Sequence, residues 1–116
     1  MRNDGFVYMV LNADRSAAKI GFTVSPYARL AQLQSANASP LTMEFAIPAQ
    51  REVEAQLHAR FADSRIRLEW FSDVDGIEEA FTALEQEHAD RQLARDFYGS
   101  TAPLELKSAD VIGLLA

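Results

Sequence analysis

The chain has no cysteine among its 116 residues, so it can form neither a disulfide framework nor a thiolate zinc site. It also lacks any run approaching the roughly 20 apolar residues that span a bilayer, and its first residues lack the apolar core of a signal peptide. We therefore expect a cytoplasmic protein that does not bind a membrane. Hydrophobic residues make up 48% of the chain and charged residues 24%, which is typical of one folded globular domain.

Positive charge is scarce, since the net charge is −6. A nucleic-acid partner usually requires a basic surface, so the total argues against one. The distribution weakens that argument. Residues 1–70 hold eight Lys/Arg and seven Asp/Glu, whereas residues 71–116 hold three and ten. The first part can therefore present a local basic face, and nearly all of the acidity belongs to the last third.

Two polar groups interrupt a predicted β-hairpin near the start of the chain. Residues 6–11 are apolar except for the hydroxyl of Tyr8, which predicts a central strand covered on both faces. A polar turn follows, and residues 17–23 return as an antiparallel strand that carries Lys19. Pairs whose residue numbers add to an odd value place Tyr8 and Lys19 on one face, and an even value separates them. We expect the odd register.

Two predicted helices carry the other candidate side chains. Ser25 and a following proline favour a helix start, and Arg29 falls at the edge of that helix's apolar stripe. A third strand is expected over residues 41–47, and a second helix over residues 49–63. On that helix Glu54 and His58 are spaced i and i+4, so they share one flank.

The remaining third of the chain is predicted to be mainly helical. Residues 64–68 form a short basic connector to E-W-F at residues 69–71, and an acidic amphipathic helix follows over residues 74–95. We expect a short edge strand over residues 104–107 and a terminal helix over residues 108–116. The acidic helix is explained as a solvated face that covers the sheet. The alternatives are that its negative field limits non-specific DNA binding, or that the apolar side chains of the terminal helix dock a protein partner or a second copy.

These elements predict an α+β fold with a three-stranded antiparallel sheet flanked by helices. Residues 1–73 form the expected core, and residues 74–116 an acidic C-terminal helical extension and tail packed on the same domain.

The order of motifs resembles the GIY-YIG nuclease superfamily, in the phage-type branch related to open reading frame 172 of phage T5. The resemblance covers about residues 5–73 and rests on G-F-V-Y at residues 5–8, K-I-G at residues 19–21, an arginine at position 29, V-E-x-x-L-H at residues 53–58 and E-W-F at residues 69–71. Lysine replaces the tyrosine of the second motif, as is common in that branch. The late asparagine of many superfamily members has no clear counterpart.

The resemblance implies an endonuclease that hydrolyses DNA phosphodiester bonds with Mg²⁺ or Mn²⁺, in the cytoplasm of a bacterium or a phage-infected host cell. Glu54 would bind the metal ion, which keeps several waters because one carboxylate cannot fill its shell. Arg29 would bind the scissile phosphate. Tyr8 would orient or deprotonate the attacking water, with Lys19 as the cation that lowers the pKa of the phenol. His58 completes the candidate set.

Each residue also has a structural explanation. Tyr8 suits a core tyrosine with its hydroxyl at the sheet edge, Lys19 a solvated strand residue, and Arg29 a helix-surface charge. Glu54 and His58 suit a surface pair; His58 alone suits a core-edge residue, a phosphate contact or a partner of a metal ligand. We interpret Glu69 as an ion-pair partner and Trp70 as a packing anchor. A non-catalytic DNA-binding module and an acidic protein-interaction domain are the alternative functions.

Overall fold

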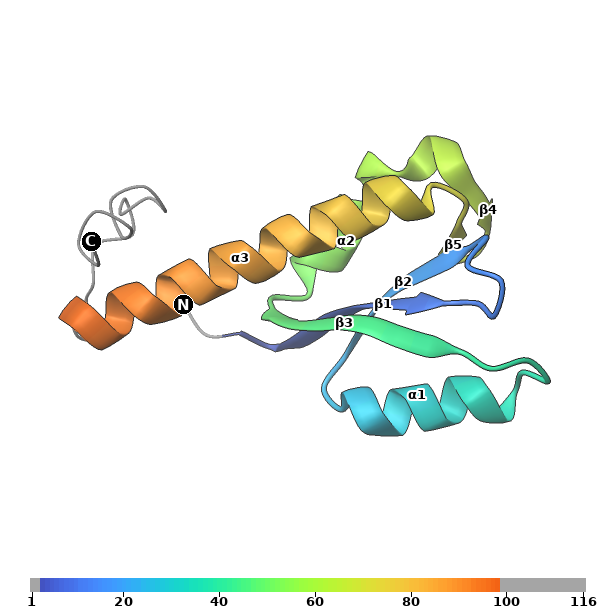
Figure 1. Cartoon of the computed structure of the whole chain (residues 1–116), viewed down its shortest axis with the longest axis horizontal. Coiled ribbons are helices and arrows are strands. Elements are labelled where there is room, and N and C mark those ends of the chain that lie inside the picture. Colours follow the sequence, from blue (N-terminus) through green and yellow to red (C-terminus); the bar gives the residue numbers. More distant parts are fainter. Residues whose placement is uncertain (1–2, 99–116) are drawn as a thin grey trace. The chain divides into compact units, whose positions relative to one another are not determined.

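The computed structural model describes residues 3–98. The chain divides into two compact units, Met1–Phe81 and Thr82–Ala116. The first unit contains a β-sheet, two α-helices, a short 3₁₀ helix and the start of a third α-helix (Figure 1). The second unit, described to residue 98, continues that third helix and carries an ion pair between Glu87 and Arg91. The predicted strand at residues 104–107 and helix at residues 108–116 lie outside the described part.

The sheet has five strands rather than the three expected, so that prediction was wrong. The strand order is β3-β1-β2-β5-β4, and every pair is antiparallel. The strands are β1 (Gly5–Leu11), β2 (Ala18–Thr23), β3 (Thr42–Ala49), β4 (Arg65–Arg67) and β5 (Trp70–Phe71). The added strands β4 and β5 are too short for alternating hydrophobicity to become visible, and β4 is exposed throughout. The chain remains α+β.

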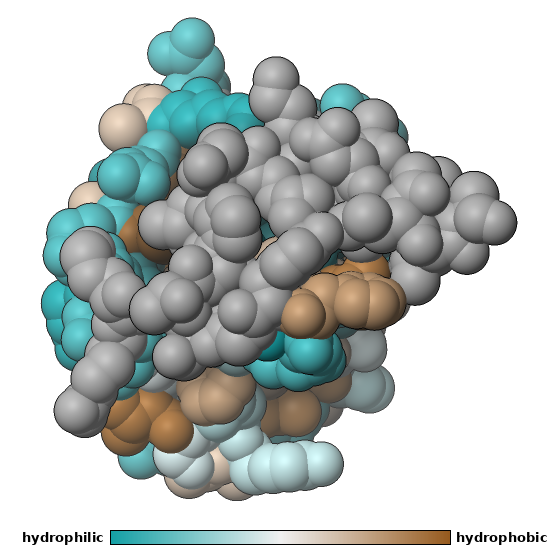
Figure 2. Space-filling model, turned by 90° about the vertical axis from the view of Figure 1, so that its left-hand side faces the viewer, coloured by the Kyte–Doolittle hydropathy of each residue, from teal (hydrophilic) through white to brown (hydrophobic). Residues whose placement is uncertain are grey.

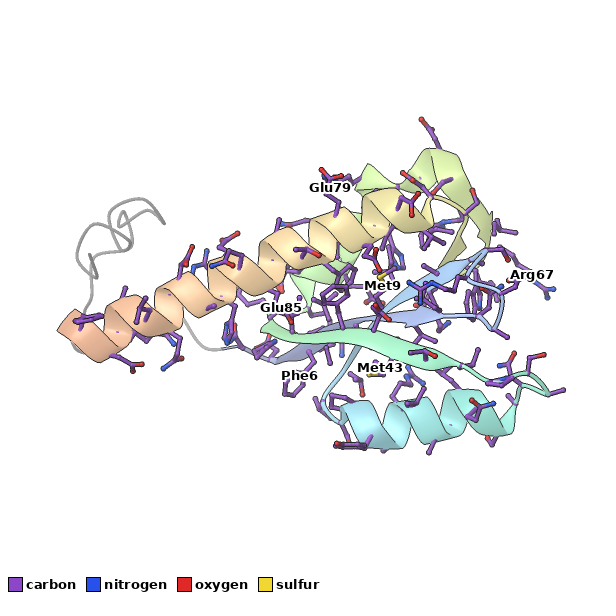
Figure 3. All side chains as sticks on the ribbon, in the orientation of Figure 1. Phe6, Met9, Met43, Arg67, Glu79 and Glu85 are labelled. Atoms are coloured by element: carbon purple, nitrogen blue, oxygen red, sulfur yellow. The ribbon has the colours of Figure 1, made fainter. Side chains whose placement is uncertain are left out.

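Strand β1 is central, as its apolar sequence predicts. It pairs with β2 on one side and β3 on the other, and all of its residues from Val7 to Leu11 are buried. Alternate residues point to opposite faces. Figure 3 shows Met9 on one face of the sheet, and Phe6 and Met43 on the other face, towards the first helix.

The predicted helices are present with shifted ends. They are α1 (Pro26–Ser35), α2 (Glu52–Arg60) and α3 (Val74–Tyr98). Ser25 occupies the N-cap position of α1 but makes no side-chain capping bond there. Helix α2 begins later than expected because the chain remains extended in β3 as far as Ala49, and it ends before the 3₁₀ helix η1 (Ala62–Ser64).

The core of the first unit lies between the sheet and the apolar faces of α2 and α3. Leu57 of α2 and Phe61 just after it are buried, as are Ile77 and Phe81 of α3. The ring of Phe81 stacks on that of Phe45 in β3, with centroids 5.6 Å apart. This packing covers one face of the sheet and fixes α2 beside β2, where the candidate site lies.

No helix within residues 3–98 is long and apolar enough to cross a membrane. On the face drawn in Figure 2, hydrophilic and hydrophobic residues are intermixed over the described part of the surface.

Candidate functional site

The register of the first hairpin brings Tyr8 and Lys19 to one face of the sheet. Tyr8 lies opposite Gly21, and Val10 lies opposite Lys19. The residue numbers of each pair add to an odd value, which confirms the predicted register. Tyr8 and Lys19 are therefore diagonal neighbours on adjacent strands, close enough to belong to one site.

Tyr8 is fully buried at 0% exposure, yet its hydroxyl has no hydrogen-bond partner among the described residues. The ring lies directly over Gly21. An ideal Cβ built at position 21 would approach Cζ and Oη of Tyr8 to less than 3.0 Å, a separation that real Cβ atoms do not show. Glycine is therefore required at position 21 by the ring of Tyr8. A buried hydroxyl without a partner costs about 1–3 kcal/mol, so it calls for a functional explanation.

Three charged side chains lie close enough to Tyr8 to act on its hydroxyl. Burial raises the pKa of the Tyr8 phenol, and the carboxylates of Glu69 and Glu54 raise that pKa further. The guanidinium of Arg29 opposes the rise without reaching the geometry of a hydrogen bond. The predicted site residues Tyr8, Arg29 and Glu54 are thus brought together by β1, α1 and α2. The cation acting on Tyr8 is Arg29, whereas the sequence suggested Lys19.

Lys19 instead forms an ion pair with Glu69. Its Nζ lies 3.0 Å from Oε1 of Glu69, and the lysine side chain is mostly buried. The same ammonium group lies 5.8 Å from the centre of the Trp70 ring, its neighbour across β2 and β5. The ion pair predicted for Glu69 is therefore present, and Trp70 packs beside the site.

His58 is anchored to the backbone of β2. Its Nε2 lies 2.9 Å from the carbonyl oxygen of Ile20; because a carbonyl only accepts, Nε2 donates, which leaves Nδ1 of the neutral ring with a free lone pair. The backbone N–H of Ile20 donates to the carbonyl oxygen of Glu69 over 3.1 Å. One residue of β2 thus positions both the imidazole and the turn that carries Glu69.

Glu54, His58 and Glu69 form a cluster of potential metal ligands. One ligand atom from each lies within 4.8 Å of the other two. Burial is the main cause that raises the pKa of the Glu54 carboxyl; the nearby Glu69 raises it further, while His58 and Arg51 lower it. Two carboxylates that repel each other in a partly buried position are stabilised by a divalent cation. Carboxylate oxygens suit Mg²⁺, and a mixed oxygen and nitrogen set also suits Mn²⁺.

Glu69 is the site residue that the sequence did not assign to the metal cluster. It follows Leu68 in a two-residue turn between β4 and β5, and Leu68 has a positive φ of 53°. This turn aims Glu69 at Lys19 and at the cluster simultaneously. The only signal in the sequence was its position beside Trp70, which does not reveal the direction of the side chain.

Fold and site together define an α+β domain with tyrosine, arginine and carboxylate groups gathered at an antiparallel sheet. The family model described as T5orf172 domain matches residues 5–87. The chain therefore belongs to the T5orf172 domain family, which confirms that branch of the predicted resemblance. No curated protein and no solved structure shows a significant match to the chain.

Proposed function

We propose that the protein is a metal-dependent endonuclease that hydrolyses DNA phosphodiester bonds, and that its family forms part of the GIY-YIG nuclease superfamily. The observation that carries this proposal is the buried hydroxyl of Tyr8, which has no hydrogen-bond partner within residues 3–98 and whose pKa responds to Arg29, Glu69 and Glu54. A core tyrosine needs no arginine and no carboxylates around its hydroxyl. A site that must bind a phosphate, a water molecule and a cation needs all of them.

Arg29 is suited to bind the scissile phosphate. Its guanidinium is a planar, permanently charged donor whose fork matches two phosphate oxygens. In the structure Nη1 of Arg29 donates a long hydrogen bond of 3.4 Å to Oε1 of Gln32. This weak contact engages only one of the five guanidinium donors and is easily exchanged for a substrate oxygen. Arg29 also stabilises the negative charge that grows on the phosphate oxygens in the transition state.

Tyr8 is suited to hold the attacking water. Because the pKa of its phenol is raised, the group is neutral near pH 7, and a neutral phenol can donate one hydrogen bond and accept another. It therefore orients the water rather than removing its proton. The unmatched hydroxyl obtains its missing partner when the substrate and its water enter the site.

The residues present fit a divalent metal ion. Glu54 would hold it, with His58 and Glu69 within reach of the same position. When bound, Mg²⁺ or Mn²⁺ supplies Lewis-acid stabilisation of the departing 3′ oxygen. The repulsion that raises the pKa of Glu54 is the electrostatic feature that such an ion relieves. The ion pair with Glu69 places Lys19 beside this position, where it offsets part of the negative charge of the carboxylates.

A DNA substrate also fits the distribution of the arginines. Ion pairs hold Arg15 to Glu44 and Glu78, whereas no ion pair within residues 3–98 involves five other arginines, which are Arg29, Arg51, Arg60, Arg65 and Arg67. Free guanidinium groups on one part of an acidic chain suit a polyanion. Because such an enzyme works on intracellular DNA, we place it in the cytoplasm of a bacterium or a phage-infected cell.

Conversion of supercoiled plasmid to nicked circles tests the activity. We expect cleavage with Mg²⁺ or Mn²⁺, none in EDTA, and none with Glu54→Gln. The matched control is Glu52→Gln, because Glu52 is an exposed glutamate of the same helix outside the metal cluster. Equal nicking by wild type and Glu54→Gln would refute the role of Glu54.

The same assay separates the alternative functions. Salt-dependent DNA binding without nicking in any metal would favour a non-catalytic DNA-binding module of the same fold. Absence of salt-dependent binding would favour a protein-interaction domain. A partner or second copy bound through the C-terminal segment involves residues outside the described part of the chain.

A further inference from the structure

The hairpin of β4 and β5 exposes two apolar side chains beside two arginines. All three residues of β4 are exposed, including Ile66 at 58%, and Leu68 in the following turn is 71% exposed. Leu68 also has a φ of 53°, a conformation that glycine and asparagine adopt far more readily than leucine. A strained, exposed leucine at a hairpin tip requires an explanation.

The stability of the fold does not explain the exposed leucine at position 68. Charged residues protect an edge strand from pairing with other chains, and this accounts for Arg65 and Arg67. The same rule makes apolar groups on an edge unfavourable, so it argues against Ile66 and Leu68. Leu68 gains little from burial, and its backbone conformation costs about 1 kcal/mol or more. Asparagine or glycine at position 68 would give a more stable hairpin.

The arginines of the hairpin are available to a polyanion. Arg67 points outward from the end of the sheet in Figure 3. Arg65 lies over the ring of Phe71 at 5.2 Å, a contact that orients the side chain but does not neutralise its charge. Neither arginine has an ion pair within residues 3–98.

The hairpin tip is joined directly to the candidate site. Leu68 precedes Glu69, which forms the ion pair with Lys19 and belongs to the metal-ligand cluster. Any molecule that contacts Leu68 and the adjacent arginines is therefore held next to the position where the phosphate would react. The proximity is fixed because the backbone of Glu69 is tied to Ile20 of β2.

We propose that this hairpin is a DNA-contact element, in which Arg65 and Arg67 bind backbone phosphates and Leu68 enters the groove as an apolar wedge. The proposal rests on the proposed function, because it assigns double-stranded DNA to the same site. Apolar wedges used together with arginines are a known physical means of gripping and deforming a duplex. The strain at Leu68 is then maintained for binding rather than for folding.

Binding of a fluorescein-labelled DNA duplex by the Glu54→Gln protein in EDTA tests the wedge without cleavage. Leu68→Asn keeps a residue that tolerates positive φ but removes the apolar tip. We expect an unchanged or higher melting temperature together with roughly tenfold weaker binding, the size that follows when one leucine side chain is no longer buried against the duplex. Equal DNA affinity of Leu68→Asn and its parent would overturn the proposal.

The salt dependence of binding tests the arginines. Arg65→Gln with Arg67→Gln should reduce the slope of log K against log salt by about 0.9 for each phosphate that the variant no longer neutralises. Arg15→Gln is the control, because Arg15 already pairs with Glu44 and Glu78, and its slope should match that of the parent. An unchanged slope in the double variant would overturn the assignment of Arg65 and Arg67 to backbone phosphates.

Two further outcomes separate this proposal from the proposed function. Metal-dependent nicking by wild type, with full DNA affinity in all hairpin variants, would overturn the hairpin proposal and leave the nuclease intact. A larger loss of affinity by Leu68→Asn for an RNA duplex than for the DNA duplex would also overturn it. Absence of nicking in any metal, with the expected losses of affinity in the hairpin variants, would refute the nuclease and support the DNA contact.

Discussion

The ring of Tyr8 occupies the space that a side chain on Gly21 would fill. The two residues face each other across β1 and β2, so the glycine makes room for a phenol whose buried hydroxyl has no hydrogen-bond partner among the described residues. Position 21 has no positive φ, so its requirement for glycine is steric rather than conformational. The register that pairs β1 with β2 therefore also sets the geometry of the site around Tyr8.

Gly21→Ala should destabilise the fold by roughly 1–3 kcal/mol, because the added methyl group overpacks the ring of Tyr8. Chemical denaturation measures this free energy of unfolding. In a Tyr8→Leu background, which lacks the atoms that the methyl group meets, the cost of Gly21→Ala should largely disappear. The same cost in both backgrounds would show that the ring does not set the requirement at position 21.

Tyr8→Phe should stabilise the protein by about 1 kcal/mol, because it removes a buried hydroxyl that has no hydrogen-bond partner in the described part of the chain. Thermal unfolding in the absence of metal and DNA measures the change. Tyr27→Phe is the matched control, since Tyr27 is 91% exposed and should leave stability unchanged. A loss of stability in Tyr8→Phe would mean that the hydroxyl is satisfied in the folded protein.

Glu54→Gln should stabilise the metal-free protein at pH 7 and have no effect below about pH 4. The pKa of Glu54 is raised on folding, by burial first and by Glu69 second. Its ionisation is therefore less favourable in the folded state, and stability falls as pH rises through the carboxyl range. Melting temperatures in EDTA across this range measure the difference. A gain of stability in Glu54→Gln that does not depend on pH would exclude this electrostatic cause.

Glu69→Gln should weaken Mn²⁺ binding by roughly tenfold or more, the loss seen when a residue in or beside a metal shell is removed. The single tryptophan, Trp70, lies beside Lys19 and reports the titration by fluorescence. Lys19→Met removes the ion pair but keeps the carboxylate, so it should bind Mn²⁺ at least as tightly as wild type. Weaker Mn²⁺ binding by Lys19→Met together with unchanged Mn²⁺ binding by Glu69→Gln would show that Glu69 is only an ion-pair partner of Lys19.

Long, patterned segments of the fold were predictable from the sequence. The apolar run of β1 indicated its central position, and the odd register followed from placing Tyr8 and Lys19 together. Strands β4 and β5 were missed because periodicity cannot be detected over two or three residues.

The site was predictable as a set of residues but not as a set of contacts. Sequence order indicated Tyr8, Arg29 and Glu54, yet it assigned the charge beside the phenol to Lys19. The turn at Leu68 directs Glu69 at Lys19, so that lysine is already neutralised and Arg29 takes its place. The tertiary contact between β2 and β5 therefore determines which cation lies beside the phenol, and no local sequence pattern encodes that contact.

The nicking rate of Tyr8→Phe on supercoiled plasmid in saturating Mn²⁺, compared with Tyr27→Phe, tests the central claim most directly. Phenylalanine keeps the ring over Gly21, so any loss of rate reports the hydroxyl itself. We predict that Tyr27→Phe nicks at the wild-type rate and that Tyr8→Phe, although at least as stable, nicks roughly 100-fold or more slowly, as expected for a residue that positions the nucleophile. Nicking by Tyr8→Phe at the wild-type rate would contradict the account.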